Sequence, residues 1–122
     1  MSDLSDPTRV IAASLLDTWV SRDWSDGLQL ASLEDLTEIR VQTRHSLYEI
    51  TVIDAAAGEI LIRGGQFFPE RTAARLAGST LRGSFLKVGG IYAGFNLEVA
   101  TDSQVVVTST VQSVHIYPSL RQ

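Results

Sequence analysis

Apolar positions recur with two different periods along the chain, and the first period marks an N-terminal segment. Ile11, Leu15 and Trp19 recur every four residues within a broad apolar stripe. This spacing is typical of the buried face of an α-helix. The dipeptide Asp6-Pro7 suits a helix start, because an aspartate can cap free N–H groups and proline fits the first turn. The pattern predicts one amphipathic helix over about residues 8–22.

From residue 38 onward, apolar residues alternate with polar ones, which is the period of a half-buried β-strand. One alternating run covers residues 39–43 and the next covers 47–53. The inward positions are odd-numbered in the first run and even-numbered in the second, so the chain must bulge or reverse between them. The tripeptide Arg44-His45-Ser46 lies at this switch.

Turn residues divide the remaining chain into short strands. Residues 54–58 predict a hairpin loop before a strand at 59–63, with Gly58 in the left-handed conformation. Eight of the nine glycines lie between residues 58 and 94, where they suit the corners of a curled sheet. We expect further strands near residues 73–77, 84–88, 91–99 and 104–117. In the last run Val105, Val107 and Val111 share one parity and Val114 and Ile116 the other, which predicts a bend or bulge near 110–113.

These elements predict a mainly β, single-domain protein over residues 1–122. We expect a small, strongly bent β-barrel of SH3-like or OB-like size, with about six or seven short strands over about 38–117, preceded by the helix. A two-sheet β-sandwich is the alternative. Ile53 and Leu61 make the second face of their strands partly apolar, and the N-terminal helix is its expected cover.

The amino-acid composition excludes several kinds of reactive and metal-binding site. The chain has no cysteine, so it can form no disulfide, thiolate nucleophile or Cys-ligated zinc site. It has only two histidines and no close His/Asp/Glu cluster at ligand spacing, so we expect neither a metal nor a cofactor. No signal peptide is recognisable, and no run approaches the about 18 apolar residues of a membrane helix. We therefore expect a soluble, cytoplasmic protein that does not bind membranes.

The net charge of −4 is unevenly distributed. Residues 1–38 carry eight acidic and two basic side chains, a balance of −6, whereas residues 39–122 carry six acidic and eight basic ones, a balance of +2. A chain with a pI of about 5.0 and a single lysine nevertheless lacks the basic stripe of nucleic-acid binders. We therefore expect no nucleic-acid partner.

Two groups of polar residues are candidate ligand contacts. Histidine can exchange protons near neutral pH, so Arg44-His45-Ser46 could carry chemistry, although a serine nucleophile would also need an oriented base. A polar turn is the simpler interpretation of this tripeptide. Glycine-rich corners beside arginines can expose backbone donors to an anion. The candidate ligand-binding residues are Arg44, His45, Ser46, Arg63 and Arg82.

Our leading hypothesis is a non-enzymatic interaction or self-assembly module, whose partner is a second copy or another protein. Phe67 and Phe68 are the candidate interface residues, because two adjacent phenylalanines before a proline suit an apolar contact. The alternative is a protein that binds a small anionic ligand or nucleotide. An enzyme centred on His45 and Ser46 comes third, and we assign no catalytic residue.

Overall fold

The structure is a computed structural model that describes residues 27–81 and 85–117. The described residues form mainly β-strands, which confirms the predicted class. The predicted helix at 8–22 lies outside them. The elements in chain order are β1 (Gly27–Gln29), the 3-10 turn η1 (Leu30–Ser32), β2 (Glu38–Thr43), β3 (Leu47–Asp54), β4 (Glu59–Gly64), β5 (Phe68–Thr80), β6 (Leu86–Val88), β7 (Gly90–Tyr92), β8 (Asn96–Ala100) and β9 (Val105–Tyr117).

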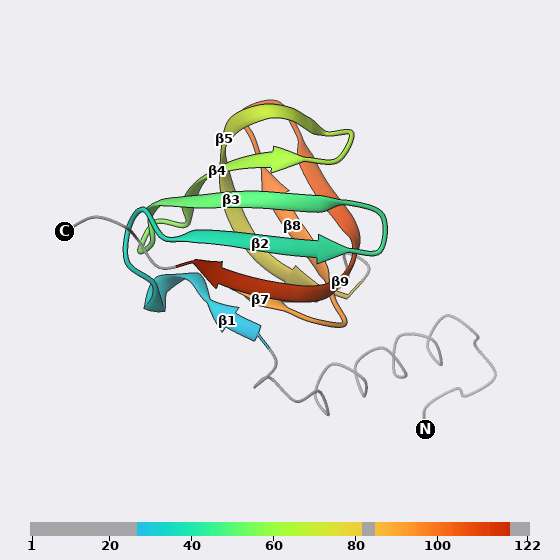
Figure 1. Cartoon of the computed structure of the whole chain (residues 1–122), viewed down its shortest axis with the longest axis horizontal. Coiled ribbons are helices and arrows are strands. Elements are labelled where there is room, and N and C mark those ends of the chain that lie inside the picture. The colour runs from blue at the N-terminus through green and yellow to red at the C-terminus, as the bar shows by residue number, and fades with distance from the viewer. Residues whose placement is uncertain (1–26, 82–84, 118–122) are drawn as a thin grey trace, which may run out of the picture.

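Seven strands belong to one antiparallel sheet in the order β4-β3-β2-β9-β8-β5-β6. A further pairing joins β4 to β5, so the ladder of hydrogen bonds closes into a ring (Figure 1). β1 and β7 form a separate two-stranded sheet. These seven strands therefore form one closed sheet, whereas the sandwich alternative would divide them between two sheets.

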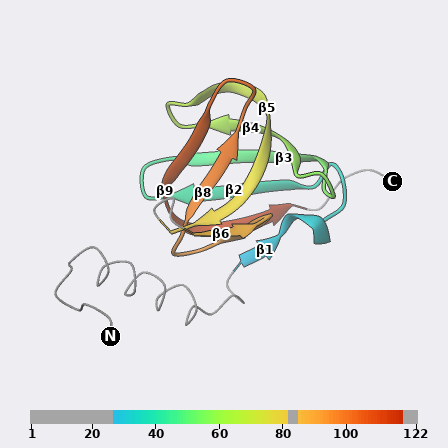
Figure 2. The same ribbon diagram turned by 180° about the vertical axis from the view of Figure 1, so that it is seen from behind.

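Two long strands close this ring. β5 and β9 each contain 13 residues and curve strongly along their length (Figure 2). β5 pairs first with β4 and then with β8, whereas β9 pairs first with β8 and then with β2. The strand expected near residues 73–77 is therefore only part of a longer one. Its start includes Pro69, which a strand tolerates at an unpaired edge because proline has no N–H group to donate.

The alternating runs on either side of Arg44-His45-Ser46 are β2 and β3, and the switch of parity between them is a reversal. Gln42 lies opposite Leu47 in the antiparallel pair. The predicted hairpin between β3 and β4 is confirmed, with Gly58 at a φ of 75°. The predicted break near residues 110–113 is also confirmed: Gln42 faces Ser113 but Thr43 faces Val111, so Gln112 is an extra residue.

The buried side chains form one apolar core cluster, to which β2, β3, β4, β5, β8 and β9 contribute. Thr43 and Ser79 are buried with it, and each is fully inaccessible to solvent. The cluster includes Ile39, Val41, Tyr48, Ile50, Val52, Ile60, Ile62, Phe68, Leu76, Leu97, Val99, Val106 and Val111.

Candidate functional site

The turn between β2 and β3 is held closed by Thr43. The N–H group of Thr43 donates to the Ser46 carbonyl at 2.8 Å, and its hydroxyl donates to the same oxygen at 3.0 Å. The Ser46 N–H group donates in turn to Thr43 Oγ1 at 3.1 Å. A threonine that bonds to nearby backbone groups in this way stabilises a turn.

Strand β9 secures the same turn from the far end of the sequence. Ser109 Oγ donates to Thr43 Oγ1 at 2.9 Å and accepts a hydrogen bond from the His45 N–H group at 3.2 Å. The Arg44 N–H group donates to the Thr110 carbonyl at 2.9 Å. The backbone of Arg44 and His45 and the hydroxyl of Thr43 thus join the turn to β9.

The Ser46 hydroxyl forms a hydrogen bond with the Tyr48 side chain. Burial raises the pKa of the Tyr48 phenol, and its hydrogen bond to the Ser46 side chain partly opposes that rise. Both groups crowd the adjoining β4–β5 turn: a Cβ on Gly65 would lie 2.8 Å from the Tyr48 hydroxyl and 3.1 Å from the Ser46 hydroxyl. The Tyr48 phenol is therefore protonated at neutral pH and can donate or accept a hydrogen bond.

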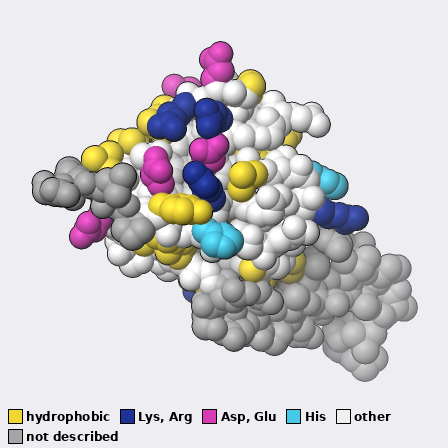
Figure 3. All heavy atoms as spheres, viewed as in Figure 1, with side chains coloured by type: hydrophobic (Ala, Val, Ile, Leu, Met, Phe, Trp, Pro, Cys, Tyr) yellow, Lys and Arg dark blue, Asp and Glu magenta, His cyan; other side chains and the backbone are white. Residues whose placement is uncertain are grey.

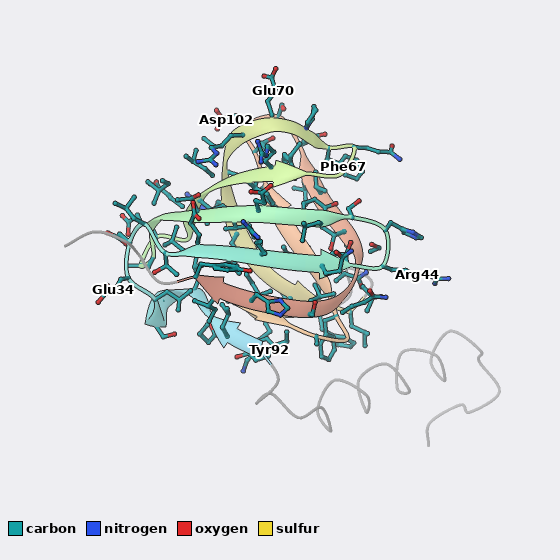
Figure 4. All side chains as sticks on the ribbon, viewed as in Figure 1. Glu34, Arg44, Phe67, Glu70, Tyr92 and Asp102 are labelled. Atoms are coloured by element: carbon teal, nitrogen blue, oxygen red, sulfur yellow. The ribbon has the colours of Figure 1, made fainter. Side chains whose placement is uncertain are left out.

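The arrangement needed for a serine nucleophile, an imidazole bonded to the hydroxyl, is not formed among the described residues. His45 is exposed and contributes its backbone N–H group to the turn. Arg44 is also exposed, and its side chain points away from the sheet (Figure 4). The turn presents these two side chains to solvent and does not gather them around a substrate.

Arg63 lies apart from that turn, in a row of charged side chains on the outer face of the sheet. Its guanidinium makes an ion pair with Glu49 at 2.7 Å. Successive register positions place His115 opposite Arg40, Arg40 opposite Glu49, and Glu49 opposite Arg63. Charged side chains gather on this face in Figure 3. Arg82 lies outside the described residues.

Three arginines act on the one carboxylate of this row. The hydrogen bond and charge of Arg63 lower the pKa of Glu49, and Arg40 and Arg71 lower it further. The Arg40 guanidinium also stacks over the Tyr117 ring, 4.7 Å from its centroid. We call Arg40, Glu49, Arg63, Arg71 and His115 the arginine row. Arg40 and Arg71 are absent from the predicted site because sequence spacing does not reveal which strands are neighbours.

The two candidate interface phenylalanines occupy different environments. Phe68 is 1% exposed and contacts Tyr48 edge-to-face, with 6.5 Å between ring centroids. Phe67 lies in the β4–β5 turn and is 51% exposed (Figure 4). Of this pair, only Phe67 is therefore available to a partner of the folded chain.

A groove of about 620 Å³ crosses the outer face where β3, β4, β5 and β8 meet. Its lining includes the apolar residues Ile53 and Leu61, and Ile53 is 38% exposed, so the second face of these strands is partly apolar as expected. Charged groups border it: Glu59, Arg75 and Asp102. The helix expected to cover this face lies outside the described residues.

The described residues contain neither a metal-binding cluster nor a membrane-spanning helix. No three or more His, Asp or Glu side chains within residues 27–81 and 85–117 are placed to hold a metal ion. In the same ranges, no helix is long and apolar enough to cross a membrane. No known protein family, curated protein or solved structure matches this chain.

Proposed function

We propose that the chain is a non-enzymatic interaction module that associates with itself. The observation that carries this proposal is the exposure of large apolar side chains outside the core. On β9, Val105 and Val107 are 64% and 42% exposed. Burying such a side chain fully is worth about 1.5–3 kcal/mol, so association has a driving force available on this surface.

The polar residues of the β2–β3 turn support a structural role for it. The hydroxyls of Thr43 and Ser109 make bonds that close the turn and join it to β9, and the Ser46 side chain bonds to Tyr48. The closed ring is in turn the basis for the finer proposal of a small, strongly bent barrel of SH3-like or OB-like size. Such a scaffold leaves its turns and outer faces free for contacts.

Light scattering coupled to size-exclusion chromatography tests self-association over a wide range of protein concentrations. We expect the average mass to rise from that of one chain toward that of two as the concentration increases. A constant single-chain mass at every concentration would refute the proposal. The same experiment at high salt gives a control, because apolar association survives the screening that weakens contacts between charges.

A second candidate function, binding of a small anionic ligand or nucleotide, rests on the arginine row. One carboxylate, Glu49, faces the guanidinium groups of Arg40, Arg63 and Arg71, so positive charge is in excess within the row. Guanidinium groups form strong, charge-assisted hydrogen bonds with phosphate. The row therefore replaces the predicted set as the best anion contact, since Arg44 and His45 are exposed on the β2–β3 turn and are not part of the row.

A melting-temperature screen with phosphate-bearing compounds tests this second candidate. A compound that binds the folded chain raises its melting temperature. We expect Arg71→Gln to remove that rise and Arg44→Gln, at the exposed turn, to keep it. Absence of any shift across a broad panel of compounds, or equal loss in both variants, would exclude the row as the site.

A further inference from the structure

The first four residues of β9 form an unpaired strand edge. Residues 111–117 of β9 pair with β2, whereas residues 105–110 pair with β8 on the other side of the strand. The β2–β3 turn reaches only as far as Ser109 and Thr110, through bonds from His45 and Arg44. Residues 105–108 therefore run past β2, and their one described strand partner is β8. We call residues 105–108 the β9 edge.

The hydrogen-bonding groups of this edge point away from the sheet. The Thr101 N–H group donates to the Gln104 carbonyl at 2.8 Å at the start of the β8–β9 pair. Hydrogen-bonded and non-hydrogen-bonded pairs alternate along an antiparallel ladder. Val99 and Val106 are thus the next bonded pair, which leaves the N–H and C=O groups of Val105 and Val107 directed to the unpaired side.

The β9 edge lacks the features with which proteins protect unpaired strands. Short length, proline and charged side chains all discourage pairing with another chain. The unpaired side of β5 carries Pro69, Glu70 and Arg71, and the outer strand β6 is three residues long with Lys87 at its centre. The β9 edge, by contrast, reads Val-Val-Val-Thr. Two of its valines, Val105 and Val107, are 64% and 42% exposed.

We infer that two copies of this chain associate by antiparallel pairing of their β9 edges. This inference rests on the self-association proposed above and names its surface. The pairing gives partners to the N–H and C=O groups of Val105 and Val107, and it brings valine side chains of the two copies together. A second copy suits this edge because residues 105–108 carry no charge, so a twofold contact sets no like charges against each other.

A matched pair of lysine variants tests the surface. Val107→Lys places a charge on the β9 edge, and we expect it to raise the dimer dissociation constant at least about tenfold. Val88→Lys changes an even more exposed valine on β6 and should leave the constant within about twofold of the original value. Equal effects of the two substitutions would overturn the inference.

Cross-linking separates failure of the surface from failure of the proposed function. The chain has no cysteine, so a single introduced thiol reports on one position. We expect a short thiol cross-linker to join two Val107→Cys chains and to leave Phe67→Cys chains single, because opposite and diagonal residues in paired strands lie within about 8 Å of each other. Cross-linking through Phe67→Cys alone would retain self-association and reject the β9 edge. A wild-type chain that stays monomeric would reject both.

Discussion

Ser109 Oγ donates a hydrogen bond to Thr43 Oγ1 at 2.9 Å, across 66 positions of the sequence. Thr43 is fully buried at the end of β2, and Ser109 lies on β9 just after the unpaired residues. This bond therefore fixes the point at which β9 leaves β2. The position of the β9 edge depends on it, so the polar turn and the proposed contact surface are structurally linked.

The Thr43 hydroxyl should be worth more to stability than an exposed hydroxyl. Thr43→Val keeps the shape of the side chain but removes the acceptor of bonds from Ser46 and Ser109. We expect it to lower the free energy of unfolding by about 1–3 kcal/mol, the cost of leaving buried polar groups unsatisfied. Ser103→Ala, in the exposed β8–β9 turn, is the control and should change it by less than about 0.5 kcal/mol. Urea denaturation measures both, and similar losses would contradict this account of the turn.

The adjacent phenylalanines provide a second matched comparison. Phe68→Ala opens a cavity beside Tyr48 and should cost about 3–5 kcal/mol of unfolding free energy. Phe67→Ala removes an exposed ring and should cost less than about 0.5 kcal/mol. Chemical denaturation of the two variants checks the difference. A large loss of stability in the Phe67 variant would show that its ring packs more tightly than its exposure indicates.

Local alternation is enough to locate the strands at the centre of this sheet. Residues 39–43 and 47–53 each show a clean two-residue period, because β2 and β3 bury one face and expose the other. The reversal at Arg44-His45-Ser46 and the extra residue near 110–113 both follow from breaks in that period. These features depend only on neighbouring residues, so one sequence can reveal them.

Features that depend on which strands pair with each other could not be predicted from local alternation. Arg40, Glu49 and Arg63 meet through the register of three strands, which no spacing along the chain encodes. Three consecutive valines also leave the inward parity undetermined. Val106 is buried, whereas Val105 and Val107 are exposed. Val111 is buried although it shares their parity, because β9 gains an extra residue against β8 between Val107 and Thr110. The unpaired β9 edge emerges only from these long-range pairings.

Tyr48 should contribute to stability in a pH-dependent way. Burial raises its pKa in the folded chain, so the folded state holds the phenolic proton more tightly than the unfolded state. The resulting stability is present below the unfolded pKa of about 10 and is lost as pH rises through the folded value.

Tyr48→Phe should cost about 1 kcal/mol at neutral pH through loss of the Ser46 bond. Its unfolding free energy should then fall less steeply in alkali than that of the wild type, as measured by denaturation across alkaline pH. Parallel alkaline profiles would show that Tyr48 titrates normally.

Glu49 should make the stability of the folded chain depend on pH in the acidic range. Its lowered pKa means that the ionised carboxylate favours the folded chain. That contribution is present above the unfolded pKa of about 4.3 and is lost as pH falls through the lower folded value. Glu49→Gln should therefore reduce the loss of stability on acidification, measured by thermal melts at a series of acidic pH values. High salt should shrink the difference from the wild type, because the group is exposed and its ion pair is screened.

The same Glu49→Gln variant also separates the two candidate functions. Removing the carboxylate frees Arg63 and leaves Arg40 and Arg71 without the negative charge they share. If the arginine row binds anions, phosphate-bearing compounds should raise the melting temperature of Glu49→Gln more than that of the wild type, since the competing carboxylate is gone. Self-association through the β9 edge involves none of these residues, so the dimer dissociation constant should stay the same. A variant that gains phosphate binding and keeps its dimer would support both surfaces, whereas one that loses its dimer would place the contact on the outer face of β2 and β3.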